Sequence, residues 1–82
     1  MDVDKVVVEE LSALFKARGE APSLTADSSL RELGFRSIDF AALALRVEER
    51  AGRELDLSRG DLSQKLNSVT DLQGFFRSVL GS

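Results

Sequence analysis

The residues best placed to do chemistry lie around Ser37, which is predicted to begin a helix over 37–51 that Gly52 ends. A hydroxyl at a helix N-terminus lies at the positive end of the helix dipole, beside backbone N–H groups without helical partners. A negatively charged group attached to Ser37 would be stabilised there, and the guanidinium of Arg36 can add a charge-assisted contact to it. The competing interpretation is structural, because serine is also a common N-cap residue.

Other reactive side chains are few in this chain of 82 residues, which contains no cysteine and no histidine. Disulfides, thiolate or imidazole metal ligands and imidazole bases are therefore excluded, and we predict no metal site. Asp27, Glu32 and Asp39 lie near one another in the sequence, but no second carboxylate pair stands at a defined helical spacing. A domain of this size also offers no obvious deep pocket, so we do not expect an enzyme.

The charge is mildly acidic, with 11 Lys and Arg residues against 14 Asp and Glu residues and a formal net charge of −3. This balance argues against nucleic acid as a partner, because nucleic-acid binding needs a basic patch. No apolar run approaches the roughly 18 residues of a membrane span, and the acidic start of the chain differs from the basic start of a signal peptide. We therefore expect no membrane contact and a cytoplasmic location.

Hydrophobic periodicity predicts an all-α fold of three longer helices and one short helix, without strands. The first helix is expected over 3–18 and ends before Gly19. Its apolar face consists of Val3, Val7, Leu11, Leu14 and Phe15. A short third helix is expected over 59–66. A last helix starts at Ser68, where Ser68 and Asp71 resemble a capping box. Its predicted apolar face consists of Val69, Leu72, Phe76, Val79 and Leu80, with Phe75 beside it.

A long loop over 19–36 separates the first two helices. We predict that three leucines anchor it to the core: Leu24, Leu30 and Leu33. Residues 28–33 can form a single helical turn, which Gly34 would end. Long loops in small domains are often functional or held by their own side chains.

The segment 27–40 resembles the phosphopantetheine-attachment segment of the acyl and peptidyl carrier protein family. In that family a Leu-Gly-x-Asp-Ser-Leu pattern opens the second helix, and its serine carries the arm. The matching residues here are Leu30, Leu33, Gly34, Ser37 and Ile38. Similarity continues at the end of the second helix, in 43–49, and at the start of the last one, in 67–72. The resemblance therefore covers essentially the whole chain.

This resemblance implies an acyl-carrier-like four-helix bundle that forms a single carrier domain over 1–82. It implies that 4′-phosphopantetheine from coenzyme A is attached to Ser37 by a phosphopantetheinyl transferase. The thiol of this arm then holds an acyl or aminoacyl group as a thioester. Enzymes that load and process this group are the implied partners, and the chain is expected to be a monomer.

One position departs from the family pattern, because Arg36 stands where the family usually has Asp before the attachment serine. The substitution puts a positive charge in place of a negative one at a position that, in the family, helps the modifying transferase. A charge change on a docking surface alters partner choice. We therefore expect a specialised carrier, serving polyketide, nonribosomal peptide or specialised lipid assembly rather than general fatty-acid synthesis.

Residues around the acceptor and along the second helix are assigned to a partner-facing surface. They are Phe35, Ile38, Asp39, Phe40, Arg46, Glu48 and Glu49. Phe40 is assigned to the surface because Ile38 and Ala41 are expected to be the residues of this turn that point toward the core. For the aromatic residues the alternative is core packing, and for the charged residues it is an ordinary solvated face. Gly34 is explained by a turn with positive φ, and it can also keep the approach to Ser37 open.

The main functional alternative is a helical protein-interaction module of the same fold that never carries an arm. In that case Ser37 is only a helix cap, and its removal costs about 1 kcal/mol of stability and nothing else. Covalent modification of Ser37 separates the two possibilities.

Overall fold

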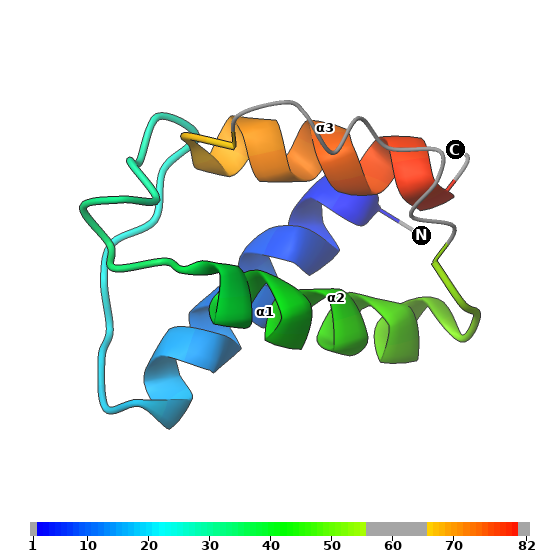
Figure 1. Ribbon diagram of the computed structural model, residues 1–82, viewed down its shortest axis with the longest axis horizontal. Helices are drawn as coiled ribbons and strands as arrows, with labels where there is room; N and C mark the ends of the chain where they lie inside the picture. Colours follow the sequence, from blue (N-terminus) through cyan, green and yellow to red (C-terminus); the bar gives the residue numbers. More distant parts are fainter. Residues whose placement is uncertain (1, 56–65, 81–82) are drawn as a thin grey trace.

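Three helices make up the fold in the computed structural model, which describes residues 2–55 and 66–80. They are α1 (Val3–Ala17), α2 (Ser37–Ala51) and α3 (Val69–Leu80). In Figure 1, α2 and α3 both begin beside the long loop, and α1 crosses behind them. Within the described ranges there is no strand, and no helix is long and apolar enough to cross a membrane. The all-α prediction is confirmed, and the predicted helix over 59–66 lies outside the described residues except for Leu66.

The ends of α1 follow the predicted signals. The Asp2 carboxylate caps the first turn by accepting a hydrogen bond from the Lys5 N–H at 3.2 Å. The helix ends at Ala17, one residue earlier than predicted, because Arg18 serves as the C-cap and Gly19 then adopts a φ of 79°.

The hydrophobic core lies between α1 and the two other helices. It contains the apolar faces predicted for α1 and α3, with two differences in α1. Val6, which was not predicted, is buried as well, and Leu14, which was predicted, is only half-buried. From α2 it takes Leu43 and Val47, which lie one turn apart on the inner face. The side chains with the least exposure are Phe15, Phe76, Leu11, Leu43, Leu72, Val7, Val47 and Val69.

An aromatic cluster joins α2 to α3 and corrects the surface assignment of Phe40. The Phe40 ring lies 5.3 Å from the Phe75 ring and 5.8 Å from the Phe76 ring, centroid to centroid. Phe40 is three residues before Leu43 and seven before Val47, so it shares their inner face. Ile38 and Ala41 are exposed instead, Ile38 at 74%, so the inward direction taken for both was wrong.

The long loop packs onto the start of α3. Its single helical turn is confirmed by a hydrogen bond from the Leu33 N–H to the Ser29 carbonyl at 3.1 Å, and Gly34 follows with a φ of 77°. Leu30 is buried in the core, and its N–H donates to the Asn67 carbonyl at 2.9 Å. The other two leucines, Leu24 and Leu33, pack against the core as predicted.

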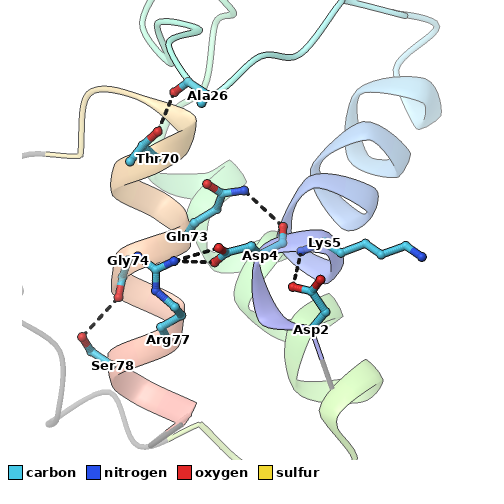
Figure 2. A network of polar contacts seen from close by, with 9 residues as sticks. All are labelled: Asp2, Asp4, Lys5, Ala26, Thr70, Gln73, Gly74, Arg77 and Ser78. Carbon is cyan, nitrogen blue, oxygen red and sulfur yellow. Dashed lines mark hydrogen bonds and ion pairs between the residues drawn. The ribbon is translucent and has the colours of Figure 1, made fainter.

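Polar contacts fix α3 against α1 and the loop (Figure 2). The Arg77 guanidinium contacts the Asp4 carboxylate at 2.8 Å, and the Gln73 amide donates to the Asp4 carbonyl at 3.2 Å. The Thr70 hydroxyl donates to the Ala26 carbonyl at 2.9 Å. The start of α3 is therefore held beside the loop that leads to α2.

The predicted capping box at this helix start is confirmed. The Asp71 N–H donates to the Ser68 hydroxyl at 3.3 Å, and the Ser68 N–H donates to the Asp71 carboxylate at 3.1 Å.

Truncating the aromatic cluster should cost much of the stability of so small a domain. We expect Phe76→Ala to lower the free energy of unfolding by about 3–5 kcal/mol, because it leaves a cavity among buried side chains. Leu45→Ala is the matched control, since Leu45 is 62% exposed and the change should stay within about 0.5 kcal/mol. Urea unfolding measures both, and equal effects would contradict the core described above.

Candidate functional site

Ser37 is the first residue of α2 rather than its cap. Arg36 occupies the N-cap position with extended backbone angles, φ −120° and ψ 175°. Ser37 is exposed, and its hydroxyl has no hydrogen-bond partner among the described residues. The N-cap interpretation of Ser37 is therefore wrong, because the chain is already helical at this residue.

The cap of α2 is provided from within the helix by Asp39, three residues after the cap position. One carboxylate oxygen of Asp39 accepts the Arg36 N–H at 2.8 Å, and the other accepts the Arg18 guanidinium at 3.1 Å. Asp39 is only 7% exposed. The assignment of Asp39 to a partner-facing surface is therefore wrong, since its carboxylate is turned inward to satisfy a backbone donor.

Arg18 links the end of α1 to the start of α2. Its guanidinium lies 4.8 Å from the centre of the Phe15 ring and also contacts Glu20 at 3.2 Å. Together with its bond to Asp39, these contacts hold the guanidinium over an anchored aromatic ring. The α2 N-terminus is thus fixed in position without using the Ser37 hydroxyl.

Gly34 precedes this helix start in a backbone conformation that favours glycine, with φ at 77°. A Cβ atom there would meet no other atom within 4 Å, so the surroundings are open. Gly34 also lines a hollow of about 450 Å³ together with Arg31 and Arg36. The positive φ is by itself enough to favour glycine, and no described residue fills the space that a side chain at this position would occupy.

Two hollows flank Phe40 on the side of α2 that bears Ser37. The first has a volume of about 310 Å³ and is lined by Phe35, Arg36, Ser37, Phe40 and Leu66. The second has a similar volume and mostly apolar walls, formed by Phe40, Ala41, Ala44, Leu45, Glu48 and Leu55. Phe40, assigned to the partner surface, therefore lies between two hollows, and the half-buried Phe35 lines the first one while packing against the core.

The other charged residues assigned to the partner surface divide between two roles. Arg46 contacts Glu10 of α1 at 3.6 Å. Glu48 is half-buried and accepts the Leu55 N–H at 3.1 Å. Glu49 is exposed. Arg46 and Glu48 therefore take part in holding the fold together, whereas Glu49 faces solvent.

Arg50 completes the contact between α2 and α1. Its guanidinium contacts Glu10 at 2.7 Å and Glu9 at 3.0 Å. These hydrogen bonds, from Glu10 first and Glu9 second, raise the pKa of Arg50 above its ordinary value. The charge of Arg50 is therefore directed to α1.

Leu45 is the surface residue that sequence reasoning did not single out. It is 62% exposed and lies seven residues after Ile38 on the same side of α2. That spacing is visible in the sequence. The alternating Ala and Leu residues of α2 did not show which side of the helix faces the core, however, and only the position of Phe40 in the structure does so.

The arrangement around Ser37 fits an attached phosphodiester. The hydroxyl is exposed, and the first backbone hydrogen bond of α2 runs from the Phe40 N–H to the Arg36 carbonyl at 3.0 Å. The N–H groups of the first helical turn before Phe40 are therefore available to an anion.

Removing the Asp39 carboxylate should loosen the helix start. We expect Asp39→Ala to lower the free energy of unfolding by about 1–3 kcal/mol, because the Arg36 N–H and the Arg18 guanidinium both lose their acceptor. Asp39→Asn should cost less, since its amide oxygen can still accept the Arg36 N–H. Glu49→Ala, at an exposed position of the same helix, is the control. Thermal unfolding measures the stability of each variant, and equal losses for Asp39→Ala and Glu49→Ala would contradict the capping role of Asp39.

A family model for the phosphopantetheine attachment site matches residues 5–75 of the chain, a range that includes Ser37 and all of α2. No curated protein and no solved structure matches the chain. Members of this family are carriers that hold 4′-phosphopantetheine covalently and catalyse no reaction themselves. The expectation that the chain is not an enzyme is therefore confirmed, and the chain belongs to the phosphopantetheine attachment family.

Proposed function

We propose that the chain carries an acyl or aminoacyl intermediate on a 4′-phosphopantetheine arm attached to Ser37. The observation that carries this proposal is the exposed Ser37 hydroxyl, which stands at the start of α2 and bonds to none of the residues that the structure describes. When bound, the arm supplies a thiol that holds the intermediate as a thioester. A phosphopantetheinyl transferase attaches the arm, and loading and processing enzymes act on the intermediate.

The chain's own contribution near Ser37 is to bind and orient the phosphodiester. Free N–H groups of the first turn and the positive end of the helix dipole favour its negative charge. The exposed Arg36 side chain stands next to Ser37 and can donate to the same phosphate. The Asp39 carboxylate does not compete with the phosphate for these donors, because its oxygens already accept from Arg18 and from the Arg36 N–H.

The apolar hollow along α2 supports partial shelter of the bound intermediate. It is lined by small side chains, Ala41 and Ala44, and shares Phe40 with the hollow that borders Ser37. An apolar group that extends from Ser37 past Phe40 into this hollow would be removed from contact with water, which is favourable.

The pathway is proposed from the charge beside the attachment site. Arg36 places a positive charge where the family usually has a negative one. We propose a dedicated polyketide, nonribosomal peptide or specialised lipid pathway on this ground, because charge at a docking surface selects among partners.

Replacing the acceptor tests attachment directly. Incubation with coenzyme A, magnesium and a broad-specificity transferase should add one phosphopantetheine to the wild type and none to Ser37→Ala, as read by intact mass. The exposed Ser12→Ala is the matched control and should keep the adduct. Ser37→Ala should change the free energy of unfolding by no more than about 0.5 kcal/mol, since the hydroxyl caps nothing. A wild type that several transferases leave unmodified would favour the interaction-module alternative.

Filling the hollow tests the shelter. Ala41→Phe places a large side chain in it from an exposed position of α2. We expect hydroxylamine to cleave a medium-chain acyl group from this variant faster than from the wild type, at a rate closer to that of free acyl-pantetheine. Ser12→Ala again serves as the control, and unchanged protection in Ala41→Phe would show that the acyl group lies elsewhere.

A further inference from the structure

Arg18 and Asp39 form an ion pair that joins the end of α1 to the start of α2. The Arg18 guanidinium donates to one carboxylate oxygen of Asp39 at 3.1 Å. Among the described residues, Arg18 is the one cation within ion-pair distance of Asp39. Asp39 follows Ser37 by two residues in the first turn of α2. A charge attached to Ser37 would therefore lie within one helical turn of this pair.

Burial distinguishes this pair from the other ion pair of Arg18. The Asp39 side chain is 9% exposed, whereas Glu20, which contacts a different nitrogen of the same guanidinium at 3.2 Å, is 52% exposed. Water screens the charge of Glu20 well and that of Asp39 much less. A buried charge without a partner is unfavourable. The Asp39 carboxylate therefore depends on Arg18 to balance its charge.

Attachment of the arm adds an anion to this same turn of α2. The Ser37 hydroxyl is neutral, and the phosphodiester formed on it is negatively charged. Without Arg18, the phosphodiester would lie beside an unbalanced carboxylate, and like charges repel. The released oxygen of Asp39 would also be free to accept from first-turn N–H groups, which are the donors available to the phosphodiester. Both effects oppose an anion where the helix dipole favours one.

We propose that Arg18 is a positioning residue for the phosphopantetheine arm. It balances the charge of Asp39 and holds one of its oxygens, which keeps the start of α2 favourable for the phosphodiester on Ser37. This proposal rests on the proposed function, because it requires the arm on Ser37. Loss of Arg18 should therefore destabilise the chain more when the arm is attached than when it is absent.

A cycle of four proteins measures this coupling. The unfolding equilibrium constant is obtained in urea for the wild type and for Arg18→Met, each with and without an arm added from coenzyme A by a broad-specificity transferase. We expect the arm to raise the constant of Arg18→Met by roughly three- to tenfold more than that of the wild type. The difference should shrink at high salt. Arg18→Gln takes the place of Arg18→Met if circular dichroism shows the latter to be unfolded.

Three further variants separate the charge effect from a loss of packing. Arg18→Lys keeps the charge, so the arm should affect it nearly as it affects the wild type. Combining Arg18→Met with Asp39→Asn removes both charges and leaves an amide oxygen for the Arg36 N–H, so the extra effect of the arm should disappear. Arg50→Met is the matched control, because Arg50 also pairs with carboxylates of α1 but lies about 20 Å further along α2. The arm should affect it as it affects the wild type.

The outcomes distinguish this proposal from the proposed function. An equal effect of the arm on the wild type and on Arg18→Met would overturn the role of Arg18 and leave carrier function intact, and so would an extra effect that persists when Asp39→Asn is added. A folded Arg18→Met that takes up no arm, while the doubly substituted chain takes it up, would support the role. A wild type that no transferase modifies would overturn both proposals.

Discussion

The buried carboxylate of Asp39 is the interaction on which the presentation of Ser37 depends. It satisfies the Arg36 N–H at the start of α2 and accepts the Arg18 guanidinium at the end of α1. A helix start normally needs such a partner, and a serine would often supply it. Because a residue inside the first turn does so here, the Ser37 hydroxyl is left exposed on a helix whose position is fixed.

The sides of α2 also differ in the contacts that they make. Its inner side packs Leu43 and Val47 into the core, and its α1 side uses Arg46 and Arg50 in ion pairs. The remaining surface holds the hollows beside Phe40 and the exposed side chains of Ile38 and Leu45. Surface ion pairs contribute little to stability individually. Their larger effect here is to direct the side chains of Arg46 and Arg50 toward α1.

Much of the fold could be predicted from the sequence, because helix periodicity and end signals agree along the chain. The range of α2, the glycine after α1, the capping box of α3 and the leucine-anchored loop were all readable. The inner face of α2 was not. Apolar residues occur on several sides of this helix, so Phe40 and Ile38 could be assigned either way until the Phe75 and Phe76 rings fixed which side is buried. Asp39 was misplaced for a related reason, since its partner Arg18 lies 21 residues earlier.

These contacts also explain how Arg36 can occupy a position where the family usually has an acidic residue. The residue at this position joins the helix start through its backbone N–H, which bonds to Asp39, and not through its side chain. A guanidinium has donors only, so it could not have capped the free N–H groups of the first turn. Because the carboxylate of Asp39 supplies the cap, the side chain at position 36 has no capping role, and it is exposed next to Ser37. Its charge can therefore change without weakening α2.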